Sequence, residues 1–299
     1  MAATTTADAP RRPAGRRLAG FLWRRPRLQL GLLLAGPIGW LVVAYLGSLA
    51  VLFAAAFWHL DTFSGEIVRG FTLDNFRTLA EGEVYRSIVL RTVLIAAAVT
   101  ITDAVLAFPI AFFMAKVARP RTRALLVIAV VMPLWSSYLV KVYAWRIILA
   151  EDGILNWALD PFGLSGPGFG NVATWLVFSY LWLPFMILPV YAALERIPNS
   201  LLDASSDLGA GAWLTFRRVV LPLAKPAVVA GSIFTFSLTL GDYITPQIVS
   251  STQFIGNVVY TNVGVANNLP LAAAFATVPV VIMVLYLLAA RRLGAFESL

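Results

Sequence analysis

Long apolar segments alternate with short polar stretches along this chain of 299 residues. A helix needs about 20 predominantly apolar residues to cross a bilayer, and the apolar segments reach that length. The pattern therefore predicts an all-α membrane protein with six transmembrane helices. We expect these helices at about residues 30–58, 92–115, 124–143, 172–194, 226–249 and 271–290.

The segment that precedes the first helix is a basic tail over residues 1–29, rich in Ala, Pro and Arg, which we expect to be disordered and cytoplasmic. A basic start before an apolar run also suggests a secretory signal peptide. The run over residues 30–58 is about twice as long as the apolar part of a signal peptide, however, and favours a retained helix.

The basic residues predict the orientation of the helices. Seventeen of the 23 Lys and Arg residues fall in the tail, after the second helix, between the fourth and fifth helices, and at the C-terminal end. Because cytoplasmic loops carry the excess of Lys and Arg, both termini are expected inside. The chain has a net charge of +8, and its basic residues cluster at the ends of the apolar segments. We therefore expect a lipid bilayer and no nucleic acid as partner.

The composition and the motifs of the chain argue against several kinds of catalytic and metal-binding site. Hydrophobic residues make up 60% and charged residues 13% of the chain, whereas soluble domains carry roughly 45–50% and 25%. There is no cysteine, and the one histidine, His59, ends the first apolar segment. None of the three lysines stands in a phosphate-binding P-loop, and we find no catalytic or metal-binding pattern. The sequence predicts no enzyme and no cofactor in this chain.

One polar stretch, residues 197–226, lies between two membrane-length segments and predicts two short helices joined at Gly209. Glycine accepts the left-handed conformation that commonly ends a helix. Gly211 can cap the second helix, which we expect to end before Pro222 because proline disfavours helical geometry in the preceding residue. By itself this pattern is also typical of a helical loop on a membrane surface.

Two acidic residues lie within the apolar segments. Asp103 falls near the middle of the second helix, where a charge costs roughly 3 kcal/mol and should face other helices or water. Asp242 lies towards the outer end of the fifth helix, where Gly241 and Pro246 are expected to bend or break the helix. Either acid could meet a cationic substrate. Alternatively, Asp103 forms a structural hydrogen bond, or serves as the proton site of a self-contained secondary carrier.

The polar stretch resembles the EAA loop of the permease subunits of type I ABC importers. Asp203-Ala204-Ser205 corresponds to the Glu-Ala-Ala triplet, Gly209 to its glycine and Leu221-Pro222 to its closing pair, at the spacing of the family. Asp for Glu and Ser for Ala are departures that keep the charge and the small size. The resemblance implies a MetI-like fold, here over residues 87–290.

Further segments resemble one branch of that family, the spermidine/putrescine permeases of the PotB/PotH type. They are Arg91-Thr92, residues 107–111, residues 142–145 followed by 153–156, and residues 241–246. This implies a polyamine path in which Asp242 and Asp103 pair with ammonium groups and Tyr243 and Trp145 offer aromatic faces. Permeases for other small solutes, such as amino acids or phosphonates, share these segments, so the exact substrate stays open.

The resemblance also implies partners in a bacterial cell membrane. ATP and Mg²⁺ would be bound by two separate ATP-binding cassette subunits that dock on the EAA loop. An extracytoplasmic solute-binding protein would deliver the substrate. One six-helix chain forms half of a path, so the second half would be a homologous permease of the PotC/PotI type or a second copy of this chain.

Overall fold

The computed structural model describes residues 25–61 and 63–292, and these divide into two units at Ala54 and Ala55. The first unit is one apolar helical segment, built from α2 (Pro26–Trp40), the π-helical η1 (Leu41–Leu46) and α3 (Gly47–Ala55). It begins earlier than the predicted residue 30, with Pro26 in its first turn, where the missing N–H has no helical partner to lose. Most of the basic tail lies outside the described residues.

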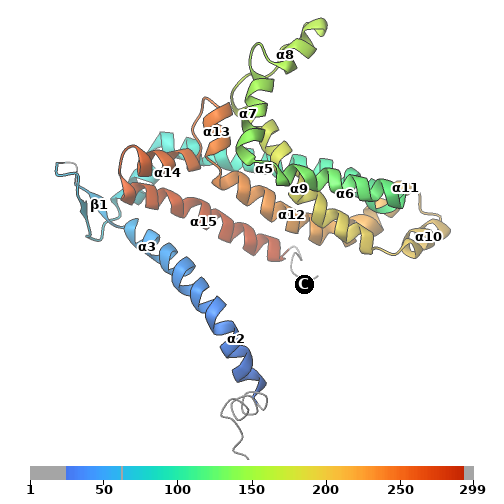
Figure 1. The fold of residues 1–299 in the computed structure, drawn as a ribbon, viewed down its shortest axis with the longest axis horizontal. Coiled ribbons are helices and arrows are strands. Elements are labelled where there is room, and N and C mark those ends of the chain that lie inside the picture. The colour runs from blue at the N-terminus through green and yellow to red at the C-terminus, as the bar shows by residue number, and fades with distance from the viewer. Residues whose placement is uncertain (1–24, 62, 293–299) are drawn as a thin grey trace, which may run out of the picture. The chain divides into compact units, whose positions relative to one another are not determined.

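Long helices form the body of the second unit (Figure 1). The helix α5 (Glu83–Phe112) starts before the predicted residue 92 and continues as the π-helical η2 (Phe113–Val117). It packs against α9 (Asn171–Arg196) and α12 (Leu221–Gly241), and α15 (Leu269–Arg292) packs on α12. Small residues of α5 at the contact, including Ala96, Ala107 and Ala111, are fully buried. They let the helix backbones approach closely, as is usual in membranes.

The third predicted span is not one straight helix, so the expectation of a single helix over residues 124–143 is wrong. It consists of α6 (Pro120–Trp135) and α7 (Tyr138–Leu149), which meet at 95°. At the break the Pro133 carbonyl loses its regular helical bond and accepts from the Ser136 N–H at 3.3 Å, the Ser136 hydroxyl at 2.8 Å and the Lys141 amine at 3.1 Å. These side-chain donors satisfy the freed carbonyl and make the sharp bend possible.

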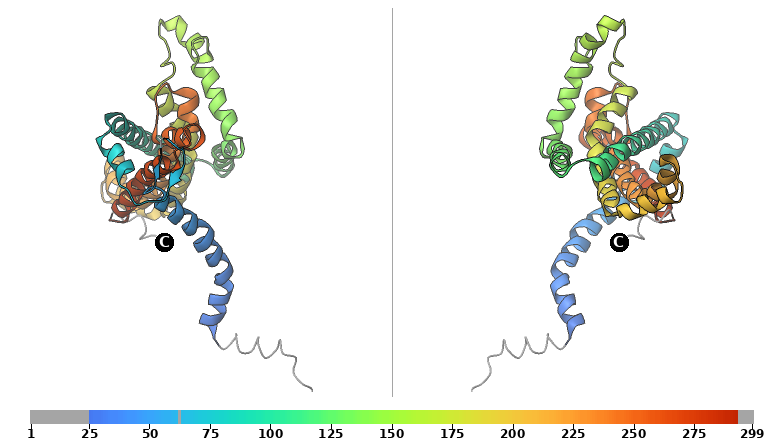
Figure 2. Two further views of the ribbon diagram at one scale, coloured as in Figure 1. Left: turned by 90° about the vertical axis from the view of Figure 1, so that its left-hand side faces the viewer. Right: turned by 90° about the vertical axis from the view of Figure 1, so that its right-hand side faces the viewer.

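Beyond the bend, α7 is followed by α8 (Ile154–Leu159) and the 3-10 turn η3 (Asp160–Phe162), which together project away from the long helices (Figure 2). Within the described residues, five helices are long and apolar enough to cross a membrane, or six if the bent pair is one span. The predicted number of spans therefore requires the broken one.

The second helix of the polar stretch does not end before Pro222, which corrects that prediction. Four-residue α11 (Ala212–Thr215), π-helical η4 (Phe216–Val220) and α12 form one apolar helical segment from Ala212 to Gly241. Pro222 lies in the first turn of α12. The wider π-helical turn before it leaves room for the proline ring, which would clash with a regular helical turn.

Short elements connect the long helices. A hairpin pairs β1 (His59–Leu60) with β2 (Ile67–Val68) antiparallel, and α4 (Asp74–Glu81) follows. The predicted fifth span ends at Gly241 rather than 249, because a break separates α12 from α13 (Ile244–Val249). The sequence pattern did not predict α14 (Ile255–Gly264), which packs on α15.

Candidate functional site

The polar stretch forms an elbow at one end of the long helices, with α10 (Asn199–Asp207) and α11 as its two arms (Figure 1). Gly209 has φ +79°, in the left-handed region predicted for it. The N–H of Gly209 bonds the Ser206 carbonyl at 2.8 Å, and that of Ala210 bonds the Ser205 carbonyl at 3.0 Å. This pattern satisfies the last carbonyls of α10 and turns the chain sharply.

The outer face of α10 is exposed. Asp203 and Ala204, the first two residues of the triplet, are exposed, and Leu208 is 88% exposed at the tip of the elbow. The inner face carries Leu202, which packs on the buried cluster at this end of α5 and α9. The elbow therefore presents an acidic and apolar surface away from the helix body.

The third residue of the triplet, Ser205, points inward. Its hydroxyl shares a hydrogen bond of 2.9 Å with the Thr215 hydroxyl of α11. The neighbouring Ser206 hydroxyl instead donates to the Leu202 carbonyl of its own helix at 3.1 Å. The departure from alanine at position 205 thus comes with a contact that joins the two arms of the elbow.

We expect Ser205→Ala to lower the free energy of unfolding by about 1 kcal/mol, because it leaves the buried Thr215 hydroxyl without this partner. Thermal unfolding of the purified protein measures this. Ser206→Ala is the matched control and should change stability by less than about 0.5 kcal/mol, since it removes only a local bond. Equal effects of the two substitutions would contradict the role of Ser205.

The elbow packs loosely on α5. An apolar cavity of about 840 Å³ opens between them, lined among others by Phe108, Phe216 and Leu221. The Phe108 and Phe216 rings touch edge to face, with centroids 5.2 Å apart. Leu221 and Pro222, the closing pair of the motif, begin α12 beside this cavity. The closing pair thus joins the elbow to a helical segment that ends at Gly241, about 30 Å away along the α12 axis.

At the far end of α12, Asp242 is half-buried in the predicted break and joins three helices. Its carboxylate accepts hydrogen bonds from the Tyr138 hydroxyl at the start of α7 and from the Thr245 hydroxyl at 3.1 Å. It also accepts from the N–H groups of Ile244 at 2.8 Å and Thr245 at 3.3 Å. Asp242 therefore caps α13 and holds α7 against the break.

Tyr243, the next residue, lies against α14. Its ring stacks on Tyr260 with centroids 4.8 Å apart, and its carbonyl accepts from the Asn257 amide at 2.9 Å. A Cβ at Gly256 would lie 2.9 Å from the Tyr243 Cβ, so only glycine allows α14 this close. The two tyrosines border a cavity of about 400 Å³. Tyr260 also borders a second, polar cavity of about 240 Å³.

The other two predicted pathway residues lie elsewhere. Asp103 is fully buried, and neither its carboxylate nor the buried Ser179 hydroxyl of α9 has a hydrogen-bond partner within the described residues. Asp103 lies in the interior of the helix bundle, as expected for an acid that should face other helices. Trp145 packs against Tyr180 of α9, with centroids 5.5 Å apart. The structure thus brings Asp242 and Tyr243 to one place and leaves Asp103 and Trp145 outside their network.

Sequence reasoning missed the partners of Asp242 and Tyr243, which are Tyr138, Thr245, Asn257 and Tyr260. Thr245 lies within residues 241–246, one of the segments that resemble the family, and Tyr138 follows the serine pair of the third span, but nothing in the sequence paired them. In the described part of the chain, no group of three or more His, Asp or Glu side chains could hold a metal ion.

Comparison with known proteins identifies the family. Residues 92–295 match the model of the binding-protein-dependent transport system inner membrane component. The inner membrane ABC transporter permease protein YdcU of Escherichia coli is 48% identical, over 98% of each chain. The spermidine/putrescine permease protein PotB of Haemophilus influenzae is 31% identical, over 72% of this chain and 76% of its own.

Solved structures have the same fold. A chain of the bacterial alginate ABC transporter, crystallised with a pentasaccharide-bound periplasmic protein, superimposes with a TM-score of 0.74 at 17% identity, covering 93% of this chain and 97% of its own. The predicted type I importer fold and the membrane location are confirmed. Family membership also favours a transport subunit over an enzyme or a self-contained carrier. The chain belongs to the binding-protein-dependent transport system inner membrane components and is an ABC importer permease subunit.

Proposed function

We propose that this permease subunit imports polyamines of the spermidine and putrescine class. The observation that carries the proposal is the identity of 31% with a spermidine/putrescine permease over most of both chains. The name of the more similar YdcU relative states no substrate. The site at the end of α12 suits a polyamine, because it combines an acid with two stacked tyrosines bordering an open cavity.

The acid and the aromatic rings would act on ammonium groups in different ways. The Asp242 carboxylate supplies negative charge, and the faces of Tyr243 and Tyr260 attract cations through their ring quadrupoles. Several weak contacts of this kind would bind a polyamine without slowing its release. Asp103 is fully buried and would need a rearrangement to join the path, and Trp145 would offer its ring on α7.

The energy would come from two separate ATP-binding cassette subunits, which bind ATP and Mg²⁺. The exposed face of α10 is the surface on which one of them would dock, with Asp203 facing basic groups of the ATPase. Closure of the ATPases would displace the elbow, and the segment Ala212–Gly241 would carry this motion to the break at Asp242. Such rigid-body movement would alternate access to the path.

The remaining subunits are inferred from the family to which the chain belongs. One chain would supply half of it, and a homologous permease of the PotC/PotI type or a second copy of this chain would supply the other half. An extracytoplasmic binding protein would deliver the polyamine, in keeping with the binding-protein dependence of the family.

Uptake by cells tests the substrate. Deletion of this chain from its host should abolish uptake of radiolabelled spermidine or putrescine at low concentration, and expression of the chain should restore it. Labelled amino acid and phosphonate serve as comparison solutes, whose uptake should not change. Unchanged polyamine uptake together with loss of one of the comparison solutes would refute the polyamine proposal and leave the family assignment intact.

A further inference from the structure

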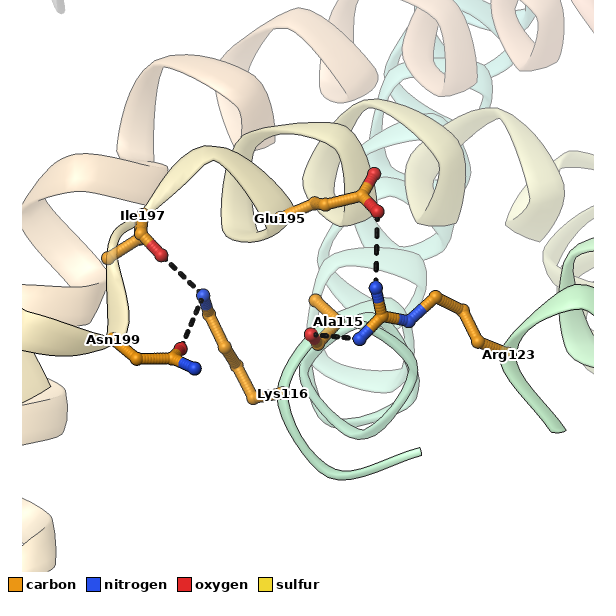
Figure 3. Close-up of polar contacts among 6 residues, drawn as sticks. All are labelled: Ala115, Lys116, Arg123, Glu195, Ile197 and Asn199. Carbon is orange, nitrogen blue, oxygen red and sulfur yellow. Dashed lines mark hydrogen bonds and ion pairs between the residues drawn. The ribbon is translucent and has the colours of Figure 1, made fainter. Parts of the chain in front are cut away.

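Lys116 and Arg123, two of the basic residues that follow the second predicted helix, make specific contacts at the base of the elbow (Figure 3). Lys116 lies in the π-helical η2 that ends the second span. Its amine donates to the Ile197 carbonyl and, at 3.3 Å, to the Asn199 side-chain oxygen. Ile197 follows the last residue of α9 and Asn199 is the first residue of α10. Lys116 thus bridges the joint between these two helices.

Arg123, at the start of α6, makes a second bridge (Figure 3). One guanidinium nitrogen donates to the Ala115 carbonyl of η2 at 3.0 Å. Another pairs with the Glu195 carboxylate in the last turn of α9 at 3.3 Å. Their side chains are 33% and 48% exposed. Arg123 therefore holds both the end of the second span and the end of α9.

The placement of both cations has a physical cause. The last carbonyls of a helix have no partner within the helix and carry partial negative charge, so cations are stabilised there. Lys116 and Arg123 lie at the C-terminal end of α9, and Arg123 also binds a carbonyl at the end of η2. Ile197 and Pro198 form the non-helical joint between α9 and α10, and Lys116 binds across it.

We propose that Lys116 and Arg123 are positioning residues that lock the joint between α9 and α10 to the turn between η2 and α6. The inference rests on the proposed coupling role of the elbow. It adds a second route for the motion, because displacement of α10 would move the second and third spans together with α12. Without these bridges, α10 would follow the ATPase while the joint absorbed part of the movement.

The test compares ATP hydrolysed per solute imported, measured on the complete complex reconstituted in liposomes. Lys116→Met keeps the aliphatic stem and removes the charge and the donors. We expect this ratio to rise about fivefold or more, within the usual range of coupling between sites. The conservative variant Lys116→Arg keeps a charged donor, and its ratio of ATP hydrolysed to solute imported should stay close to that of the unaltered complex. Arg121→Gln removes an exposed neighbouring charge and should leave the ratio unchanged.

Should Lys116→Met prevent assembly, the pair of Arg123 and Glu195 provides a second test. Arg123→Glu alone should uncouple hydrolysis from import, and adding Glu195→Arg should restore part of the coupling. A normal ratio in an assembled Lys116→Met complex, or no rescue by the charge exchange, would overturn the proposal. Failure of the unaltered complex to couple ATP hydrolysis to any import would instead refute the function of the elbow itself.

Discussion

Gly209→Val is expected to abolish ATP-driven uptake while the chain still inserts into the membrane. Gly209 has φ +79°, a conformation that costs an L-residue roughly 1–2 kcal/mol and costs a β-branched residue more. A Cβ at this position would meet no other atom within 4 Å, so the effect is conformational rather than a clash. The elbow would open, and the outer face of α10 would turn away from the position proposed for docking of the ATPase subunit. The measurement is substrate uptake normalised to the amount of chain in the membrane.

Two glycines in the elbow allow a matched comparison. Gly211 has φ −70° and also has open space around it, so Gly211→Ala should keep nearly normal uptake. Gly209→Asn should retain partial activity, because asparagine tolerates the left-handed region better than valine. Loss of uptake in Gly211→Ala but not in Gly209→Val would contradict the importance of this backbone conformation.

The proposed docking surface on α10 has a test of its own in the same assay. Asp203→Lys reverses the charge of an exposed side chain on the outer face of α10, and we expect it to abolish ATP-driven uptake with normal insertion. If both Asp203→Lys and Gly209→Val support normal uptake, the elbow is not the point at which energy enters this subunit.

Asp242→Asn is expected to impair polyamine uptake far more than membrane insertion. Asparagine keeps an oxygen that can accept from the N–H groups of Ile244 and Thr245, so the cap on α13 survives. The negative charge is lost, and with it a charge-assisted contact to an ammonium group. We expect the polyamine concentration for half-maximal uptake to rise about tenfold or more, as for the loss of a hydrogen bond to a charged group.

Tyr138→Phe distinguishes the effect of the Asp242 charge from the effect of its hydrogen bond to α7. It removes the hydroxyl that donates to Asp242 and leaves the carboxylate in place, so uptake should fall less than in Asp242→Asn. Asp242→Ala removes both the charge and the cap, and should also lower thermal stability. If Asp242→Asn imports polyamines normally, or loses uptake only in proportion to its abundance in the membrane, Asp242 acts as a structural cap and not through its charge.

Features that depend on a few neighbouring residues could be predicted from the sequence. Apolar lengths predicted six spans; in the described residues five are single helical segments, and the sixth is the bent pair α6 and α7. The left-handed turn follows from Gly209, because a glycine after a polar helical stretch readily accepts that conformation. A bend or break was predicted from Gly241 and Pro246. The break lies at Asp242 and Tyr243, directly after Gly241, whereas Pro246 lies inside α13. The end of the helix at Pro222 was predicted wrongly, because the rule for proline is local while the π-helical turn ahead of it accommodates the ring.

The sequence by itself therefore determined the class of protein, the elbow with Asp203 and Gly209, and the acids worth testing. Only the tertiary structure decided which side chains work together. Tyr138 and Asp242 are 104 positions apart, and Lys116 and Ile197 are 81 apart, so no local pattern connects them. The reason is physical: apolar length and backbone preference are local properties, whereas a hydrogen bond between helices depends on how those helices pack, and packing involves the whole chain.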